Sequence, residues 1–170
     1  ASKLEYNMQP IHPQTINMVS IVRQVAVDFI NLDIEGSHPI EWETSETLTS
    51  CLVHADKDLI KRAVGNLIQN CITHNEQGCT IHVGVTKKGD KCTVSVVDDG
   101  VGATDEQIER LNKSPHYMAC DENTSEQRHG LGLLIVRQIA AAHGGTVTIG
   151  HGMHGGFSVK FTLHARDGAG

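Results

Sequence analysis

The feature that most constrains this chain is a glycine pair followed directly by an apolar run with helical spacing. Gly130 and Gly132 are separated by one residue, the run continues from Leu133, and Gly144-Gly145 ends it. Glycine lets a backbone approach a ligand closely, because it has no Cβ. A helix that begins at such a pair directs unpaired N–H groups and the positive end of its dipole at the preceding loop. The pattern therefore predicts an anion site, most simply a phosphate site, where this helix begins.

The length and composition of the chain limit the class of protein it can be. With 170 residues it is expected to form one domain, and a net charge of −6 without a Lys/Arg cluster argues against nucleic-acid binding. Its five cysteines include no Cys-x-x-Cys pair, which predicts reduced thiols in a cytosolic protein. The eleven histidines are scattered, so the sequence does not predict a structural zinc site. We find no apolar run long enough to span a membrane and no signal peptide.

Hydrophobic periodicity predicts that helices and short strands share the chain. Helices are expected over residues 15–31, over 56–73 with Asp56 as the N-cap, and from Gly130 onward. Strands are expected over 40–44, 51–54, 80–86, 92–97, 146–150 and 157–163, with a hairpin turn at 87–90. The sum predicts a two-layer α/β sandwich, in which a mixed and mostly antiparallel sheet carries three helices on one face. The polar connection over 103–129, with one short helical stretch at 105–112, is typical of a functional or disordered segment.

Two asparagines are predicted to share one face of the second helix. Asn66 and Asn70 are four residues apart, and their apolar neighbours indicate that this face is at least half buried. A carboxamide oxygen in such a place is able to coordinate a hard cation such as Mg²⁺, which takes other ligands from phosphate oxygens. The alternative is that both side chains only cap or bridge backbone groups, and the two residues alone favour that alternative.

An acidic residue followed by spaced glycines ends the second strand of the predicted hairpin. Asp98 closes a buried strand, and Gly100 and Gly102 follow at a two-residue step. A carboxylate there is able to accept a hydrogen bond from an amino group, and the glycines allow a flat ligand to lie against the backbone. Taken alone, this motif is more typical of a tight turn with a solvated acid.

The three patterns together resemble the GHKL family of ATP-binding domains. Asn66-x-x-x-Asn70, Asp98-x-Gly100-x-Gly102 and Gly130-Leu131-Gly132-Leu133 occur in this order, on a helix, at a strand end and at a helix start. The resemblance covers roughly residues 15–164 and is strongest to the catalytic, ATP-binding domain of sensor histidine kinases. It implies a catalytic domain over 15–165, the end of a dimerisation helix with its linker at 1–14, and a flexible tail at 166–170.

The resemblance implies a role for each matching residue. Asn70 would ligate a Mg²⁺ ion that bridges the triphosphate, with Asn66 beside it in the same catalytic pocket. Asp98 would accept a hydrogen bond from the adenine amino group, and Gly100 and Gly102 would let an ATP lid formed by 103–129 pass over the nucleotide. Further nucleotide contacts are expected from His74 and from the segment at the third helix, whose backbone N–H groups would meet the phosphates: Arg128, His129, Gly130, Leu131, Gly132 and Leu133.

One position separates the branches of this superfamily. Gyrase-like and heat-shock ATPases, and the anti-sigma-factor serine kinases, carry a glutamate four residues before the metal-binding asparagine, where it acts as a base. Here that position is Asn66, which cannot take a proton. A histidine acceptor is already nucleophilic, so this residue favours a histidine kinase over a hydrolase.

The chain departs from the family pattern around the expected nucleotide. Thr73 stands where a basic residue is usual, and His74 replaces the aromatic wall beside adenine. Arg128 replaces the first glycine of the Gly-x-Gly-Leu-Gly-Leu pattern, and we expect its guanidinium to contact a phosphate in place of the lost cation. No phenylalanine is recognisable early in the lid, where Leu111 is the nearest candidate.

The resemblance implies the ATP-binding half of a two-component sensor histidine kinase, which transfers the ATP γ-phosphate to a histidine on a separate dimerisation domain of the same parent protein. No segment resembles the acceptor-histidine motif, so the chain is expected to bind Mg·ATP as a monomer without autophosphorylation. A response regulator would be an indirect partner, and the domain is expected to be cytoplasmic in a membrane-anchored parent. Two alternatives stay open: a GHKL ATPase that hydrolyses ATP to drive conformational change, and a degenerate module that uses the fold only for docking.

Overall fold

The computed structural model describes the backbone of residues 10–113 and 125–166, and their side chains except those of residues 125–132 and Met153. The described helices are α2 (Met18–Leu32), α3 (Lys57–His74), α4 (Asp105–Lys113) and α5 (Ser125–Ala142). The strands are β1 (Gln14–Asn17), β2 (Ile40–Trp42), β3 (Leu52–Ala55), β4 (Ile81–Lys88), β5 (Lys91–Asp98), β6 (Thr146–His151) and β7 (Phe157–His164). A 3-10 turn, η2 (Met153–Gly155), connects the last two strands. The predicted linker at 1–14 and tail at 166–170 lie largely outside these residues.

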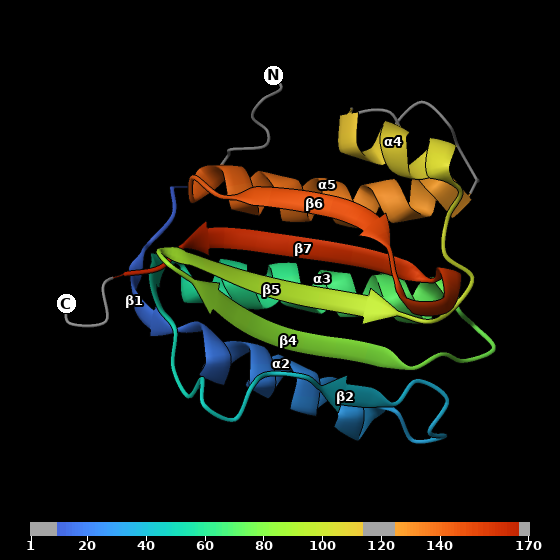
Figure 1. The fold of residues 1–170 in the computed structure, drawn as a ribbon, viewed down its shortest axis with the longest axis horizontal. Coiled ribbons are helices and arrows are strands. Elements are labelled where there is room, and N and C mark those ends of the chain that lie inside the picture. Colours follow the sequence, from blue (N-terminus) through green and yellow to red (C-terminus); the bar gives the residue numbers. More distant parts are fainter. Residues whose placement is uncertain (1–9, 114–124, 167–170) are drawn as a thin grey trace.

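Five strands form one sheet in the order β2-β4-β5-β7-β6, and β1 pairs with β3 in a separate two-stranded sheet. β2 runs parallel to β4, while the other neighbours in the large sheet are antiparallel. Helices α2, α3 and α5 lie on one face of this sheet, and α4 packs beside β6 (Figure 1). The predicted α/β sandwich is confirmed, and so is the β4–β5 hairpin.

The core lies between the large sheet and the three helices. Alternate residues of β4 and β5 are buried, because successive strand side chains point to opposite faces. Against them α3 places Ile60, Val64, Leu67 and Ile68, each at most 1% exposed. Burying one side chain of this size contributes about 1.5–3 kcal/mol. This packing fixes α3 against the middle of the sheet, where it positions the residues discussed below.

The N-cap residue expected for α3 is confirmed. The Asp56 carboxylate accepts hydrogen bonds from the backbone N–H groups of Asp58 (3.1 Å) and Leu59 (3.2 Å). It also accepts one from the His12 N–H at 2.8 Å, and the Asp56 N–H donates to His143 Nε2 at 3.0 Å. The bond from His12, helped by those from Leu59 and Asp58, holds the pKa of this carboxyl below its usual value. Asp56 therefore ties the start of α3 to the N-terminal segment and to the end of α5.

The predicted start of the first helix at residue 15 is wrong. Residues 14–17 form β1, which is antiparallel to β3 and pairs Ile16 with Val53. The helix begins only after Asn17, whose Oδ1 accepts hydrogen bonds from the N–H groups of Val19 (3.1 Å) and Cys51 (3.0 Å). Pairing with a strand far along the chain overrides the local helical spacing, which continues without interruption through these residues.

The predicted start of the third helix at Gly130 is also wrong. The helix begins at Ser125, so that Gly130 and Gly132 lie inside α5 and not ahead of it. Glutamate, glutamine and arginine at 126–128 are favourable helix formers, and they extend the helix toward its N-terminus.

The described cysteines Cys51, Cys71, Cys79 and Cys92 are free thiols. None of the helices in the described ranges combines the length and the apolar character that crossing a membrane requires.

Candidate functional site

The predicted polar residues gather at one end of the molecule. The C-terminal end of α3, the end of β5, the β6–β7 connection and α4 lie together there, at the right of Figure 1. Asn66, Asn70 and His74 follow one another at four-residue steps on α3, so they share one face of that helix. Asp98 is the last residue of β5, which packs against α3. The fold therefore places Asn70 and Asp98 toward the same end of two adjacent elements, while Asn66 lies one turn earlier, near the middle of α3.

Asp98 carries a carboxyl group that is buried, with 2% of the residue exposed. Its Oδ1 accepts hydrogen bonds from the N–H groups of Gly100 (2.9 Å) and Phe157 (3.3 Å), and its side chain also bonds to the Cys71 thiol. Burial raises the pKa of Asp98 above its usual value, against the opposing effect of these bonds. Burial also raises the pKa of the Cys71 thiol, which therefore remains a protonated donor. A carboxyl group buried in this way is suited to accept a donor group of a ligand.

The segment after Asp98 packs closely against a side chain at Gly100 and against backbone at Gly102, which requires both glycines. A Cβ on Gly100 would collide with the Asn75 carboxamide, and a Cβ on Gly102 would collide with the Gly155 carbonyl oxygen. Gly102 also has a φ of +65°, a conformation that strains other residues. The space beside Gly100 is thus filled by a side chain of the protein itself. The role of both glycines beneath a lid stays a prediction.

Asn75 is a site residue that sequence reasoning missed. It ends α3 and is 5% exposed, its Nδ2 donates to the Cys71 carbonyl at 2.8 Å, and its Oδ1 accepts from the Val101 N–H at 2.8 Å. The Asn75 backbone carbonyl also bonds to His38 Nε2 at 2.6 Å. An asparagine at a helix end signals a cap, but its bond to Val101 depends on a loop 26 residues away. Asn75 therefore holds the glycine loop against the end of α3.

The Asn70 side chain carries a buried polar atom without a hydrogen-bond partner among the described residues, as is typical of a ligand-binding group. Within the described part of the chain, its Nδ2 is buried and has no hydrogen-bond partner. Leaving such a group unpaired costs about 1–3 kcal/mol. Rotation of the carboxamide exchanges its two ends, so the group is able to offer its oxygen to a hard cation or its nitrogen to a phosphate oxygen. The Asn70 carboxamide oxygen is a suitable ligand atom for Mg²⁺, and Asn66 lies one turn earlier on the same face of α3.

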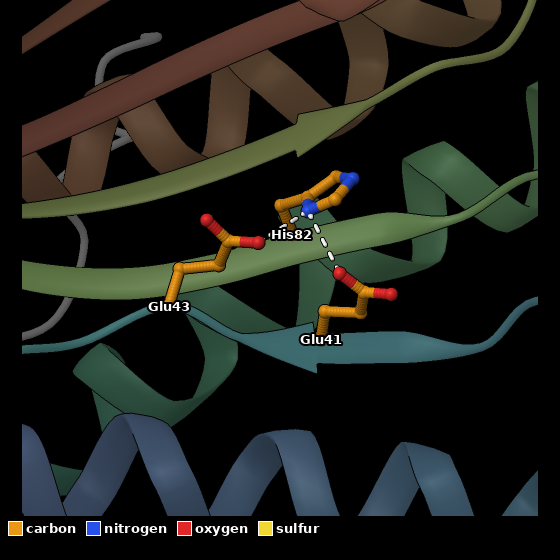
Figure 2. A group of neighbouring side chains, drawn as sticks. All are labelled: Glu41, Glu43 and His82. Carbon is orange, nitrogen blue, oxygen red and sulfur yellow. Dashed lines mark hydrogen bonds and ion pairs between the residues drawn. The ribbon is translucent and has the colours of Figure 1, made fainter.

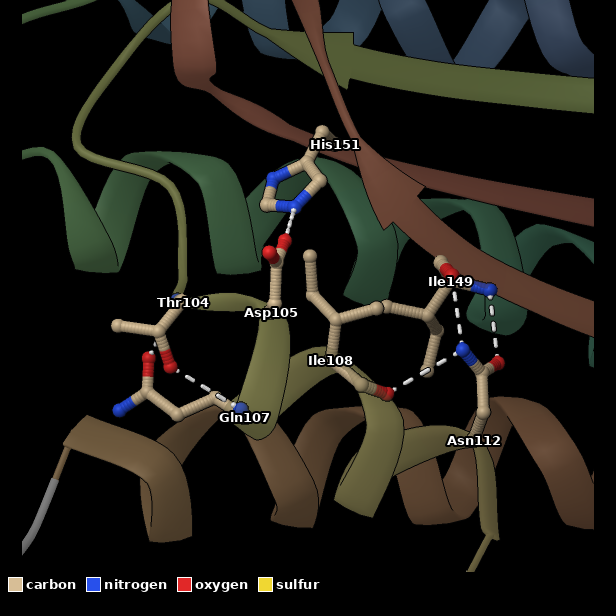
Figure 3. A network of polar contacts seen from close by, with 7 residues as sticks. All are labelled: Thr104, Asp105, Gln107, Ile108, Asn112, Ile149 and His151. Atoms are coloured by element: carbon tan, nitrogen blue, oxygen red, sulfur yellow. Dashed lines mark hydrogen bonds and ion pairs between the residues drawn. The ribbon is translucent and has the colours of Figure 1, made fainter.

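Polar contacts fasten α4 to β6, as Figure 3 shows. Asn112 Nδ2 donates to the Ile149 carbonyl at 2.8 Å, and Asn112 Oδ1 accepts from the Ile149 N–H at 3.0 Å. The Asn112 side chain thereby pairs with both backbone hydrogen-bonding groups of Ile149 at the edge of β6, as a neighbouring strand would. His151, at the end of β6, contacts the Asp105 carboxylate at 2.5 Å. The first part of the predicted lid is therefore docked on the sheet.

A second attachment joins α4 to α5. The Arg137 guanidinium donates to the Leu111 carbonyl at 2.6 Å, and burial lowers the pKa of this arginine. Leu111 is 4% exposed and belongs to the hydrophobic core. It is a packing residue in this structure, and its role as the lid counterpart of a phenylalanine stays a prediction.

The remaining predicted contacts are only partly described. Residues 128–132 are helical within α5, but the side chains of Arg128, His129 and Leu131 lie outside the described residues. Leu133 is 2% exposed, so its side chain packs in the core. His74 lies in the last turn of α3. The phosphate contacts of residues 128–133 and the adenine contact of His74 therefore stay predictions.

Comparison with protein families gives one match that covers most of the chain. Residues 55–167 match the family described as histidine kinase-, DNA gyrase B-, and HSP90-like ATPase. Among curated proteins, the sensor protein IrlS of Burkholderia pseudomallei is 36% identical over 66% of this chain and 25% of its own length. Sporulation kinase B of Bacillus subtilis is 31% identical over 89% of this chain and 34% of its own length. The chain thus spans about a third or less of the curated relatives it matches.

Solved structures give a similar result for the fold. The catalytic domain of histidine kinase ThkA is 25% identical with a TM-score of 0.75, and the match covers 91% of this chain and 98% of that one. The ATP-binding domain of PrrB from Mycobacterium tuberculosis is 17% identical with a TM-score of 0.71, over 91% of this chain and 98% of that one. Both matches extend over nearly the whole of the compared domains.

Proposed function

Because the chain belongs to the family of histidine kinase-, DNA gyrase B- and HSP90-like ATPases, we propose that it binds Mg·ATP between α3 and the end of β5. It is a catalytic domain of the sensor histidine kinase type, because a curated relative is a kinase and a structural neighbour is the catalytic domain of a histidine kinase. One observation carries the location of the site. The buried Asp98 carboxyl lies beside the helix on which the buried Asn70 amide lacks a partner among the described residues.

We assign a separate part of the nucleotide to each of these groups. Asp98 accepts a hydrogen bond from the adenine amino group, and its rigid position favours adenine over bases that lack an amino donor there. Asn70 offers its carboxamide oxygen to Mg²⁺, with Asn66 in the same pocket. Gly130 and Gly132 leave the backbone of α5 without a Cβ, so that phosphates are able to approach it closely.

Phosphoryl transfer from ATP requires mainly that the nucleotide is positioned and that the charge on its phosphates is neutralised. When bound, Mg²⁺ neutralises charge on the phosphate oxygens. Asn66 takes no proton from water, so the site lacks at this position the base that a hydrolase needs. Asp98 and Asn70 fix the two ends of the nucleotide, and the γ-phosphate is then presented to an external acceptor.

We further propose that the acceptor is a histidine on a dimerisation domain of the same parent protein. The matched regions make up only 25% and 34% of the two curated relatives, which leaves room in such a parent for that domain. A response regulator then receives the phosphoryl group, and the domain works on the cytoplasmic side of a membrane-anchored parent.

The adenine assignment is tested by calorimetric titration with a non-hydrolysable ATP analogue. We expect Asp98→Asn to weaken binding about 10- to 150-fold, because a hydrogen bond to a charged group contributes about 1.5–3 kcal/mol. The matched control is Asp90→Asn, which changes a side chain that is 76% exposed in the turn at the other end of β5. Equal affinity of the Asp98 variant and its control would remove the adenine site from this position.

The metal assignment is tested by the same titration with and without Mg²⁺. We expect Asn70→Ala to abolish the gain in affinity that Mg²⁺ gives the parent chain, while Asn31→Ala, on an exposed position of α2, retains it. Retention of the full Mg²⁺ effect in Asn70→Ala would contradict the assignment.

The external acceptor is tested with labelled ATP. Labelled ATP is expected to leave no phosphate on this chain, and strong incorporation would contradict the proposal that the acceptor lies outside it.

A further inference from the structure

Three side chains from two neighbouring strands bring their ligand atoms together on the large sheet. Glu41 lies on β2, Glu43 follows directly after that strand, and His82 lies on β4, as Figure 2 shows. His82 Nδ1 is 2.6 Å from Glu43 Oε2 and 3.6 Å from Glu41 Oε1. Of the described His, Cys, Asp and Glu residues, these form the group of three whose ligand atoms all lie within 4.8 Å of one another.

The strand register fixes this cluster. In the parallel β2–β4 pair Glu41 is the direct partner of His82, and the Glu43 N–H extends the pairing by donating to the Val83 carbonyl at 2.8 Å. Side chains alternate along a strand, so Glu41 and Glu43 share a face that Trp42 does not. Trp42 points to the helices, where its ring lies 5.4 Å from the Arg23 guanidinium carbon. The two glutamates therefore lie on the face of the sheet that the helices leave uncovered.

Gly84 keeps room for the second glutamate. A Cβ on Gly84 would lie 3.2 Å from the Glu43 carbonyl carbon, which is tighter than ordinary contact, and 3.5 Å from the Glu43 Cβ. Glu43 is thereby able to turn toward His82, whose side chain is only 14% exposed. The imidazole is held in place, whereas the glutamate side chains are 60% and 46% exposed and remain open to solvent.

From this geometry we infer that Glu41, Glu43 and His82 form a binding site for a divalent transition-metal ion, best matched by Zn²⁺. Zinc bound to nitrogen and oxygen at about 2.0–2.2 Å in a tetrahedron holds neighbouring ligand atoms about 3.3–3.6 Å apart. The His82–Glu41 separation of 3.6 Å lies at the upper end of this range, and the His82–Glu43 separation of 2.6 Å is shorter than it, so a rotation of the Glu43 side chain away from the imidazole completes the site. Two carboxylates and a neutral imidazole balance the charge of the ion, and water fills the open fourth position.

The imidazole separates this site from the proposed Mg²⁺ site. Mg²⁺ prefers oxygen ligands in an octahedron, whereas an imidazole with carboxylates suits zinc and its neighbours in the first transition row. The two sites also lie on opposite faces of the sheet. Asp98 belongs to the buried row of β5, and its direct partner on β4 is Ile81, whose neighbour His82 points the other way.

Bound metal joins the edge strand β2 to β4. β2 has three residues and lies at the edge of the sheet, where it pairs with one strand only. A metal ion bound by Glu41 and His82 would stabilise the short pairing of β2 with β4. We therefore expect Zn²⁺ to slow amide hydrogen exchange in β2 and at the start of β4, and to raise the melting temperature of the chain.

The test is calorimetric titration of the nucleotide-free chain with Zn²⁺ alone at neutral pH, with Co²⁺ absorption as a measure of tetrahedral geometry. We expect His82→Ala and Glu43→Gln each to weaken binding about tenfold or more, since the first removes one of three ligands and the second replaces a charged carboxylate by a neutral amide that zinc binds poorly. The matched control is His164→Ala, because His164 is 70% exposed and, among the described residues, pairs with a single carboxylate, that of Asp90 at 3.9 Å.

Three outcomes decide the question. Loss of tight Zn²⁺ binding in both cluster variants but not in the control supports the site. Absence of binding to the parent chain, or binding that His82→Ala leaves unchanged, overturns it. Glu41→Gln changes a solvent-exposed group and serves as the variant whose folding is least at risk. All cluster variants are expected to bind the ATP analogue like the parent, so failure here is distinct from failure of the proposed function.

Discussion

The buried carboxyl groups at the two ends of α3 have pKa values that are shifted in opposite directions. At the N-terminal end Asp56 is 9% exposed, accepts three backbone hydrogen bonds and has a pKa below its usual value. At the other end Asp98 is 2% exposed, and burial raises its pKa although backbone donors reach it. Nearby on α3 the buried Asn70 amide has no partner within the described residues.

The contrast separates a group that stabilises the fold from groups that lower its stability. The backbone donors around Asp56 favour its charged form, so folding gains from the carboxylate. Desolvation at Asp98 and the unpaired amide of Asn70 are costs that a ligand with complementary groups would remove. The Asp56 end of α3 is therefore a structural cap, and we take the Asp98 end to be the binding end.

The largest expected effect tests how closely the Asp98 end is packed. Gly102→Ala is expected to lower the free energy of unfolding by about 2–5 kcal/mol, from the left-handed backbone and the collision with Gly155 together. Gly144, beside His143 at the Asp56 end, has a similar φ of +71° but nothing within 4 Å of an added Cβ. Gly144→Ala should therefore cost only about 1–2 kcal/mol. Urea unfolding of both variants checks this, and equal losses would show that the close contact between Gly102 and Gly155 adds nothing to the cost of the left-handed backbone.

An intermediate effect separates stability from binding. Asp56→Ala removes an N-cap and is expected to lower the free energy of unfolding by about 0.5–2 kcal/mol while ATP-analogue affinity stays at the parent value. Asp98→Asn should do the reverse, with weaker binding and no loss of stability. Chemical denaturation and calorimetry on the same preparations measure both quantities. A loss of nucleotide affinity in Asp56→Ala as large as that in Asp98→Asn would break the distinction.

The smallest effect is in the pH dependence of stability. The folded pKa of Asp56 lies below the unfolded value of 3.8, so its stabilising contribution is present above that value and is lost as the pH falls through the folded pKa. The folded pKa of Asp98 lies above 3.8, so its destabilising contribution develops as the pH rises from the unfolded to the folded pKa.

Unfolding curves between about pH 3 and pH 7 check these signs. The deficit of Asp56→Ala relative to the parent should shrink in acid. Asp98→Asn should gain stability relative to the parent as the pH rises. The opposite slope for either variant would mean that the corresponding pKa direction is wrong.

Much of the fold could be predicted because its elements depend on residues close in sequence. The Asp56 cap of α3 uses N–H groups two and three residues away, and the β4–β5 hairpin closes over a two-residue turn. The position of Asp98 at the end of a buried strand follows from the alternation of apolar residues through β5. Each of these patterns is complete within one stretch of chain, so local spacing suffices.

Apart from the start of α5, which helix-forming residues at 126–128 decide locally, the errors occur where a distant partner decides the outcome. Residues 14–17 have helical spacing, yet they pair with β3 about 40 residues away. The Asn75 carboxamide finds its partner in a loop after β5, and the space beside Gly100 is filled by that side chain. Nothing in the local sequence of either segment indicates these neighbours.

The same distinction applies to the two candidate sites. The order of Asn70, Asp98 and the glycine pair, each on its own element, was sufficient to indicate the family, and the place of a nucleotide beside these residues stays a prediction. The eleven histidines, in contrast, carried no signal, because His82 lies about 40 residues from Glu41 and Glu43. Only the parallel register of β2 and β4 places these three side chains on one face. Register depends on the packing of the whole sheet against its helices, which no short stretch of sequence contains.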